Sequence, residues 1–326
     1  MKILVRLPNW LGDAVMAVGA LRQLPFFFPG AEVSVVVKKG LQDLLPFFPF
    51  VKESFVFDKE RYKGPKGLWA FGKAIRHKQK FDLFVSLPNS FSAALMGYAT
   101  GAIERIGYKA EGRNMLLTHS FTKPQGLHRA EEYAHLLSLF TKKEIGPLDV
   151  RLAHGFTKEK YIVVNINSEA FSRRLTTAKA VELLLAVQKN VDEKIVLIGG
   201  PKEAVFVTDV YEMLIDKNGI ENLAGKTTLK NLIEILASAK AVLSTDSGPA
   251  HLANALGTQT VVLFGAGNEA HTAPYNKEFA QTIRLGQLPC EPCTKNVCVK
   301  FDTPQCLELL ETPGIISVLK QRLTKA

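Results

Sequence analysis

Short apolar runs alternate with amphipathic stretches along this chain of 326 residues. Seven runs are dominated by Val, Ile and Leu, which is typical of strands buried on both faces of a parallel sheet. They cover residues 2–7, 32–37, 81–87, 161–166, 194–200, 241–245 and 259–265. Helical periodicity predicts helices over residues 12–24, 66–79, 128–140, 177–190, 202–217, 229–238 and 249–256. This alternation predicts an α/β fold with doubly wound parallel sheets.

The alternation of strands and helices starts twice, and the chain length also favours two domains. The stretch 144–160 between the two series is polar and contains Gly146 and Pro147, which is typical of a domain boundary. We therefore predict two Rossmann-like domains, residues 1–153 and 154–326. Ligands bind such sheets beyond the carboxyl ends of the strands, so we expect a binding cleft between the domains.

The strand predicted at 241–245 ends in a polar corner with the sequence DSGPAH. Asp246 or Ser247 is expected to cap the helix that follows, and Pro249 suits its first turn. The free amides of that turn form an anion site suited to a phosphate, and Ser247 adds a hydroxyl donor. His251 lies one turn further on. The structural alternative is a well-capped helix with a packed histidine.

Two more predicted strands end in polar corners. The first strand leads through LPNWLGD to Asp13 at the start of a helix. A carboxylate there can act as a general base for a sugar hydroxyl, or it can favour the helix through the macrodipole. The strand at 161–166 is followed by Arg173 and Arg174, whose planar guanidinium groups suit phosphate oxygens. The alternative is an exposed basic loop.

Positive charge is concentrated in the first half of the chain. Residues 1–150 hold 21 Lys and Arg against 13 Asp and Glu, whereas residues 151–326 hold 20 against 18. The run 59–80 contains eight basic residues and one acid, Glu60. This predicts an anionic partner for the N-terminal domain, although a solvated surface is the simpler alternative. No apolar run predicts a membrane span, and residues 1–8 are typical of a strand rather than a signal peptide, so a cytoplasmic location is expected.

Several familiar motifs are incomplete. AGKTT at 224–228 lacks the first glycine of a P-loop, because residue 220 is Ile. GAG at 265–267 lacks the third glycine of a dinucleotide fingerprint, which disfavours a nicotinamide dehydrogenase. No Asp-x-Asp occurs, so the simplest carboxylate clamp for a metal-bound nucleotide sugar is missing.

The four cysteines of the chain, Cys290, Cys293, Cys298 and Cys306, follow the spacing C-x2-C-x4-C-x7-C. Clustered cysteines in a cytoplasmic protein are typical of a structural zinc site. The irregular spacing leaves free thiols and a disulfide open as alternatives.

Five segments together resemble a known family. LPNWLGDAVMAVGAL, NINSEAFSRRLT, VLIGGPKE, residues 222–265 and HTAPY stand in the order of the motifs of glycosyltransferase family 9, the heptosyltransferase family. The resemblance implies a GT-B fold and an inverting, metal-independent transfer that needs no cofactor. It implies ADP-heptose or another nucleotide-sugar donor in the C-terminal domain, and an anionic lipid A-core acceptor carrying Kdo in the N-terminal domain. Peripheral contact with the inner face of the inner membrane is expected, and nucleic acid is not an expected partner.

The resemblance also implies roles for individual residues. Asp13 would be the base that deprotonates the acceptor hydroxyl, and the donor would contact Asn9, Gly12, Ser168, Arg173, Arg174, Glu203, Thr227, Thr245, Asp246, Ser247, Gly248 and His251. We expect the basic run to meet the acceptor through Lys59, Arg61, Lys63 and Lys66.

The chain departs from the family at one motif. Many relatives have Lys-Arg-Trp where this chain has Arg173, Arg174 and Leu175, and the exchange of Trp for Leu removes an aromatic surface. The identity of the donor sugar therefore stays open. Three alternatives to heptose transfer remain: transfer of another sugar to a surface polysaccharide, a GT-B-fold sugar-nucleotide epimerase, and a degenerate nucleotide-sugar binding protein.

Overall fold

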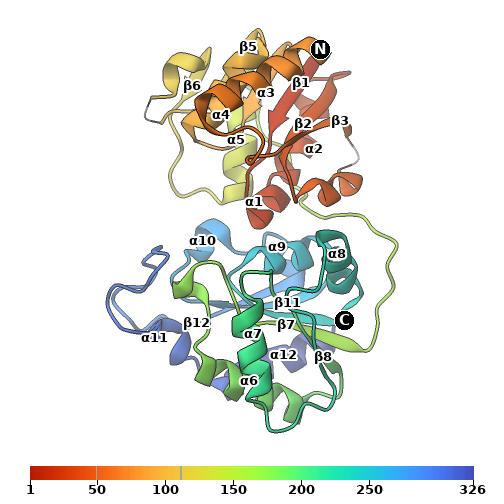
Figure 1. Ribbon diagram of the computed structural model, residues 1–326, viewed down its shortest axis with the longest axis vertical. Coiled ribbons are helices and arrows are strands. Elements are labelled where there is room, and N and C mark those ends of the chain that lie inside the picture. Colours follow the sequence, from red (N-terminus) through yellow and green to blue (C-terminus); the bar gives the residue numbers. More distant parts are fainter. Residues whose placement is uncertain (49, 111) are drawn as a thin grey trace. The chain divides into compact units, whose positions relative to one another are not determined.

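The computed structural model describes residues 1–48, 50–110 and 112–326. The chain divides into two compact units, Met1–Val150 and Arg151–Ala326. Each unit contains one six-stranded sheet with helices packed on it (Figure 1). All strand pairs in both sheets are parallel, which confirms the predicted α/β class.

The sheet of the N-terminal unit has the order β3-β2-β1-β4-β5-β6. Its strands are β1 Lys2–Arg6, β2 Glu32–Lys38, β3 Val51–Phe57, β4 Leu83–Ser86, β5 Glu104–Tyr108 and β6 His119–Phe121. Its helices are α1 Leu11–Met16, α2 Val18–Phe27, α3 Gly64–Lys78, α4 Phe91–Thr100 and α5 Arg129–Thr141, with short 3-10 helices η1 Gln42–Phe47 and η2 Asn114–Leu116.

Helices α3 and α4 pack on each other and on the same face of this sheet. Their buried residues Phe71, Ile75 and Met96 form a core with Leu4 and Phe84 of the strands. Two glycines allow the close approach. A Cβ on Gly72 of α3 would lie 2.6 Å from the Cβ of Ala99 in α4, and one on Gly97 would overlap the ring of Phe84. Any larger side chain at either position would push the helices away from the core.

The sheet of the C-terminal unit has the order β12-β11-β10-β7-β8-β9. Its strands are β7 Tyr161–Asn165, β8 Lys194–Leu197, β9 Ile220–Asn222, β10 Ala241–Thr245, β11 Gln259–Phe264 and β12 Ala280–Arg284. Its helices are η3 Phe171–Arg173, α6 Thr177–Asn190, α7 Ala204–Glu212, α8 Leu229–Ser238, α9 Gly248–Ala255, α10 Glu269–Thr272, η4 Lys277–Phe279, α11 Gln305–Glu308 and α12 Thr312–Leu323.

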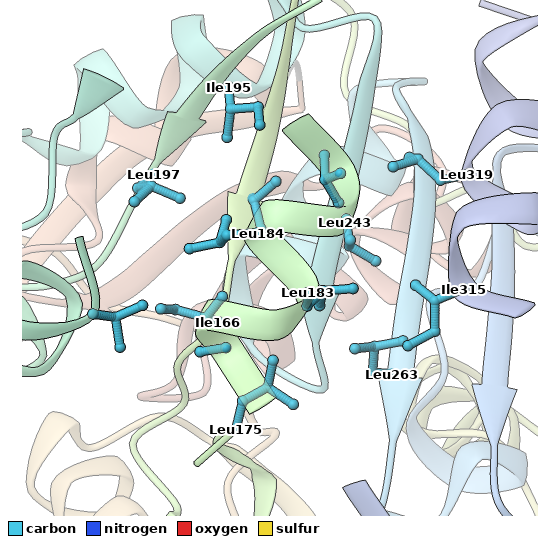
Figure 2. Packing of buried hydrophobic residues seen from close by; sticks show 14 of the residues in the cluster. Ile166, Leu175, Leu183, Leu184, Ile195, Leu197, Leu243, Leu263, Ile315 and Leu319 are labelled. Carbon is cyan, nitrogen blue, oxygen red and sulfur yellow. The ribbon is translucent and has the colours of Figure 1, made fainter. Parts of the chain in front are cut away.

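Aliphatic side chains from α6 and α12 fill the core over one face of this sheet (Figure 2). Leu184 of α6 and Leu319 of α12 are fully buried among strand residues such as Leu243. Leu175 belongs to the same cluster and is buried. Its side chain therefore packs into the core, at the position where many relatives have Trp.

The strands that the sequence pattern missed include the four sheet edges, β3, β6, β9 and β12. Edge strands are covered on fewer sides, so they need no continuous apolar run, and two of these have only three residues. The pattern also missed β5, α4 and α12. The single helix expected at 12–24 is two helices, α1 and α2, which meet at Ala17.

Among the described residues, no helix combines the length and the apolar character needed to cross a membrane.

Candidate functional site

The candidate residues of both units follow the central strands. The strand order reverses between β1 and β4 in one sheet and between β7 and β10 in the other. Asp13 follows β1, Arg173 follows β7 and Asp246 follows β10. Ligands of open parallel sheets bind at this reversal, beyond the carboxyl ends of the strands. The polar corners selected from the sequence therefore lie where the topology favours a site.

Asp13 is the third residue of α1, and its side chain faces α5. Its Oδ1 lies 3.8 Å from Nε of Arg129, and the hydroxyl of Tyr133 hydrogen-bonds to its carboxylate. Burial, together with the negative charge of Asp13, raises the pKa of Tyr133 well above its usual value. Tyr133 therefore stays protonated and can donate to Asp13. These contacts fix the carboxylate while leaving its side chain partly exposed.

A chain of alternating charges continues behind Asp13. Nη1 of Arg129 lies 3.6 Å from Glu132, whose carboxylate is buried and lies 3.1 Å from Nζ of Lys123. Arg129 is thus held between two carboxylates, those of Asp13 and Glu132. The sequence pattern did not indicate Arg129 or Tyr133 as site residues. The only available signal was a helix with two acids and a tyrosine in RAEEY, which does not show where its side chains point.

Asn9 lies in the loop between β1 and α1, and its side-chain oxygen accepts a hydrogen bond from Arg6. The Arg6 guanidinium is buried, which lowers its pKa to about 10. It also donates to the carbonyl oxygens of Leu7, at 2.6 Å, and Val36, at 3.2 Å. These bonds fix the loop that leads to Asp13. Gly12 is buried within α1, immediately before Asp13.

In the C-terminal unit the DSGPAH corner joins β10 to α9. Ser247 occupies the N-cap position of α9, but the expected side-chain cap is wrong. The Ser247 hydroxyl instead donates to the carbonyl of Thr245, at 3.1 Å, and accepts from Nδ2 of Asn165, at 2.8 Å. The Thr245 hydroxyl in turn donates to the carbonyl of Asn167, at 2.7 Å. The corner is thus tied to β7. In the first turn of α9, Pro249 has no amide hydrogen, and the amide of Ala250 donates to the Ser247 carbonyl at 3.2 Å.

Asp246 is buried at this corner beside Arg173. Its Oδ2 lies 3.2 Å from Nη1 of Arg173, and its carbonyl accepts from the Ser168 hydroxyl at 3.3 Å. Burial raises the pKa of Asp246 to about 6, against the opposing charges of Arg173 and Arg284. A Cβ on Gly267 would overlap the Asp246 carboxylate, so glycine is needed there. His251 is buried further along α9.

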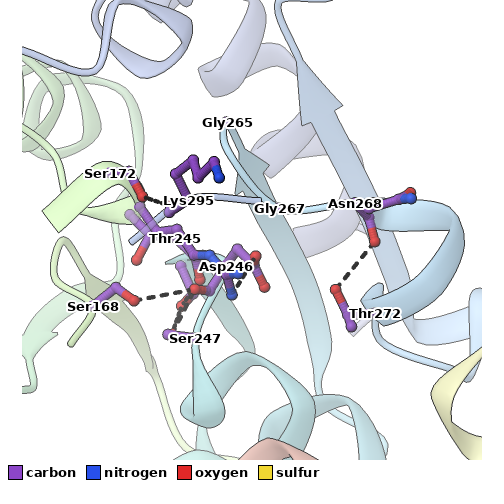
Figure 3. A network of polar contacts seen from close by, with 12 residues as sticks. Ser168, Ser172, Thr245, Asp246, Ser247, Gly265, Gly267, Asn268, Thr272 and Lys295 are labelled. Atoms are coloured by element: carbon purple, nitrogen blue, oxygen red, sulfur yellow. Dashed lines mark hydrogen bonds and ion pairs between the residues drawn. The ribbon is translucent and has the colours of Figure 1, made fainter. Parts of the chain in front are cut away.

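The segment that carries the cysteines contacts η3 next to this corner (Figure 3). The Ser172 hydroxyl, next to Arg173, donates to the carbonyl of Lys295. The amide of Thr294 donates to the carbonyl of Ala266, at 2.8 Å. Arg284 donates to the carbonyl oxygens flanking Ala266. The short helix η3 and the loop after β11 are therefore both hydrogen-bonded to residues 294–295.

Comparison with known proteins decides the family. The family model described as "Glycosyltransferase family 9 (heptosyltransferase)" matches residues 68–302. The chain belongs to glycosyltransferase family 9. It is therefore a glycosyltransferase, as the sequence motifs predicted.

Individual relatives resemble the glycosyltransferase over its full length. It is 24% identical to lipooligosaccharide heptosyltransferase 2 of Campylobacter jejuni, over 99% of this chain and 100% of the relative. The structure of E. coli ADP-heptose lps heptosyltransferase II matches with a TM-score of 0.84 at 24% identity, over 100% and 99% of the two chains. E. coli heptosyltransferase WaaC, solved with ADP-2-deoxy-2-fluoro heptose, matches with a TM-score of 0.74 at 18% identity, over 98% and 99%. These matches confirm the GT-B fold.

The two arginines of the glycosyltransferase have different surroundings. Arg173 pairs with Asp246, whereas the guanidinium of Arg174 lies between the rings of Phe171 and Phe206, 4.3 and 4.4 Å from their centroids. Burial lowers the pKa of Arg174, while the charge of Glu203 opposes this. Glu203 itself is the N-cap residue of α7. Arg174 therefore joins η3 to α7, and Arg173 is the arginine at the corner.

The remaining predicted contacts of the glycosyltransferase lie on loops, except Lys66. Thr227 precedes Thr228, the N-cap residue of α8. Lys59, Arg61 and Lys63 lie between β3 and α3, and Lys66 lies in the first turn of α3. Glu60 is 3.0 Å from Lys63, so part of this charge is paired. The roles of these residues in donor and acceptor binding remain predictions.

The four cysteines are free thiols in this structure, so the disulfide alternative is wrong for this state. Across residues 1–48, 50–110 and 112–326, no three His, Cys, Asp or Glu side chains are placed to hold a metal ion. Cys306 is buried, and burial with nearby Glu291, Cys293 and Cys298 raises its pKa to about 11. Its thiol therefore stays protonated at neutral pH.

Proposed function

We propose that this glycosyltransferase moves heptose from ADP-heptose to the inner core of lipopolysaccharide, with inversion at the anomeric carbon and without a metal ion. The observation that carries the proposal is the corner of Arg173, Asp246 and Ser247 at the strand-order reversal of the C-terminal sheet. Relatives named for lipooligosaccharide and ADP-heptose support the choice of acceptor and donor.

We assign the donor diphosphate to Arg173 and to the amide of Gly248 at the start of α9. A guanidinium binds phosphate oxygens through paired, charge-assisted hydrogen bonds. Helix N-termini bind anions through free amides and the macrodipole. Together these groups can stabilise the negative charge that develops on ADP as it leaves, which is the task that a metal ion would otherwise perform.

We assign Asp246 to the donor sugar rather than to phosphate. Its carboxylate would repel a phosphate oxygen in direct contact, so the diphosphate is assigned to Arg173 and not to Asp246. The carboxylate oxygens of Asp246 can accept further hydrogen bonds, which suits sugar hydroxyls. The hydroxyls of Ser168 and Thr245 bind the carbonyl oxygens of Asp246 and Asn167 and so fix the backbone around it. Glu203 and Thr227 are assigned to the ribose and adenine, and Asn9 and Gly12 to the surroundings of the donor.

Asp13 is the proposed base. It would take the proton from the acceptor hydroxyl while the oxygen attacks the anomeric carbon from the side opposite to ADP. The bond between that carbon and the β-phosphate oxygen breaks, and its electron pair leaves with ADP. Arg129 and Tyr133 hold the Asp13 carboxylate in place, which is the preorganisation that proton transfer requires.

We assign the anionic groups of the lipid A-core acceptor to the basic residues Lys59, Arg61, Lys63 and Lys66. A cytoplasmic location, with contact to the inner membrane, follows from an acceptor anchored in that membrane.

The first experiment measures the melting temperature with ADP, UDP, GDP and ADP-heptose, because a ligand that binds the native state stabilises it. We expect stabilisation by ADP and more by ADP-heptose, followed by transfer to a Kdo-bearing acceptor. Stabilisation by UDP or GDP alone would reassign the donor within the family. No stabilisation by any nucleotide would overturn the assignment of the corner.

A further inference from the structure

Helices α3 and α4 lie side by side on one face of the N-terminal sheet (Figure 1). Neither helix contains an Asp or Glu, whereas α3 carries Lys66, Lys73, Arg76 and Lys78. Of these, Lys78 is paired with Glu53 of β3. The outer side of this helix pair is therefore positively charged, and we call it the α3–α4 surface.

Two exposed rings meet on the α3–α4 surface. Trp69 of α3 is 38% exposed and Tyr98 of α4 is 44% exposed, with 5.8 Å between their ring centroids. A cation lies over each ring: Lys73 Nζ is 5.8 Å from the Trp69 centroid, and the Arg105 guanidinium is 5.3 Å from that of Tyr98. Aromatic rings and cations thus share one surface.

Apolar side chains extend this surface beyond the two rings. Phe91, the first residue of α4, is 46% exposed, and a Cβ on Gly112 would lie 3.6 Å from its ring. Met115 lies in η2, which contacts α4, and is 83% exposed. Exposed apolar residues gathered in one area, rather than scattered singly, indicate an interaction surface.

We propose that the α3–α4 surface docks onto an anionic lipid bilayer. Trp and Tyr rings favour the headgroup region, where one edge is apolar and the other is wet, and lysine stems can extend to anionic headgroups. Phe91 and Met115 add side chains that insert below the headgroups. A nucleic acid would also bind the Lys and Arg side chains, but contact with Met115 would not stabilise it. The combination of cations, rings and an exposed methionine therefore favours a lipid surface.

The inference rests on the proposed function in one respect: docking onto a bilayer would bring the protein to an acceptor that is anchored in lipid. Binding to vesicles needs neither donor nor acceptor. Its outcome is therefore independent of whether heptose transfer is the correct activity.

Trp69 provides the probe, because the chain has two tryptophans and Trp10→Phe leaves only one. The Trp10→Phe protein is titrated with phosphatidylcholine vesicles, with and without phosphatidylglycerol, at low and at physiological salt. We expect a blue shift of Trp69 emission and quenching by brominated lipid with the anionic vesicles. Added salt is expected to weaken binding, because the attraction to anionic headgroups is screened.

Sedimentation with vesicles tests the surface without the probe. The double variant Trp69→Ser/Tyr98→Ser is expected to bind anionic vesicles about tenfold more weakly. Lys73→Glu is expected to weaken binding to a similar degree. Phe26→Ser, which removes an exposed ring from α2, is the matched control and should bind like the unmodified protein. Unchanged melting temperatures show that each variant is folded.

Three results would overturn the proposal. The first is equal binding to neutral and anionic vesicles, and the second is unchanged binding by the Trp69/Tyr98 variant. The third is a short RNA or DNA that displaces the protein from vesicles and binds it more tightly than they do, which would identify a nucleic-acid surface instead.

Discussion

The two units share one sheet topology but carry different chemistry at the same point of it. Counted from the first strand of each unit, both sheets have the order 3-2-1-4-5-6. In the N-terminal unit the strand-order reversal is followed by one carboxylate, Asp13, held by an arginine and a tyrosine. In the C-terminal unit it is followed by Arg173 and a network of small hydroxyl and amide side chains. Topology therefore determines where a site lies, and side chains determine what it binds.

The largest expected effect tests the chemistry of the N-terminal unit. Asp13→Asn keeps the shape but removes the base, so transfer should fall by about 10³-fold, within the range of general-base catalysis. Stabilisation by ADP should be unchanged, because the residues assigned to the diphosphate, ribose and adenine lie in the other unit. Initial rates and melting temperatures check both statements, with Asp43→Asn in the first turn of η1 as the control. Turnover within tenfold of normal would exclude Asp13 as the base.

The buried carboxylate of the C-terminal unit should make stability depend on pH. The pKa of Asp246 is raised from 3.8 to about 6, so between these values the folded state binds its proton more tightly than the unfolded chain does. The contribution of Asp246 to stability therefore falls as the pH rises through this window. Asp246→Asn removes this pH dependence, so the unfolding free energy of the variant relative to the unmodified protein should rise by about 2 kcal/mol between about pH 4 and pH 7.5. Denaturant titrations at both pH values measure it, and a constant difference would contradict the raised pKa.

The two adjacent arginines sharpen the comparison within the C-terminal unit. Arg173→Ala should weaken ADP binding by about 10- to 100-fold, because a charge-assisted phosphate contact is lost. Arg174→Ala should leave ADP binding within a few-fold and lower the unfolding free energy by about 1 kcal/mol, because its contacts with Phe171 and Phe206 are lost. Calorimetry and denaturation separate the two effects. A stronger binding defect in Arg174→Ala would reverse the assignment.

A glycine substitution tests how tightly the corner is packed. Gly267→Ala places a methyl group against the Asp246 carboxylate, and overpacking of this kind costs about 1–3 kcal/mol. Gly155→Ala is the control, because its Cβ would meet open space. Denaturant midpoints compare the two variants. Equal stability of the two variants would show that the loop after β11 can shift to accommodate the methyl group, and that the Asp246 carboxylate is packed less tightly than the structure indicates.

The smallest effect compares two helix starts. Thr228 caps α8 by accepting from the amide of Asn231, at 3.2 Å, so Thr228→Ala should cost about 1 kcal/mol. Ser247 occupies the same position of α9 without capping it. We therefore expect Ser247→Ala to cost less stability but to weaken stabilisation by ADP. The opposite pattern would mean that Ser247 serves the helix rather than the ligand.

The sequence by itself determined the central strands, the alternation with helices and the family. Strands such as β10 are buried on both faces, so their sequences are continuous apolar runs. The polar residues that follow these runs indicated Asp13, Arg173 and Asp246 as candidates. The edge strands lacked that signal because fewer of their sides are covered.

Only the tertiary structure decided the partners of these side chains. It paired Asp13 with Arg129 and Tyr133, more than a hundred positions away, and Arg173 with Asp246. It also buried the Leu175 side chain in the core and placed Arg174 between the rings of Phe171 and Phe206. The physical reason is that periodicity records how deeply a position is buried, whereas partners depend on contacts between segments that the pattern does not connect.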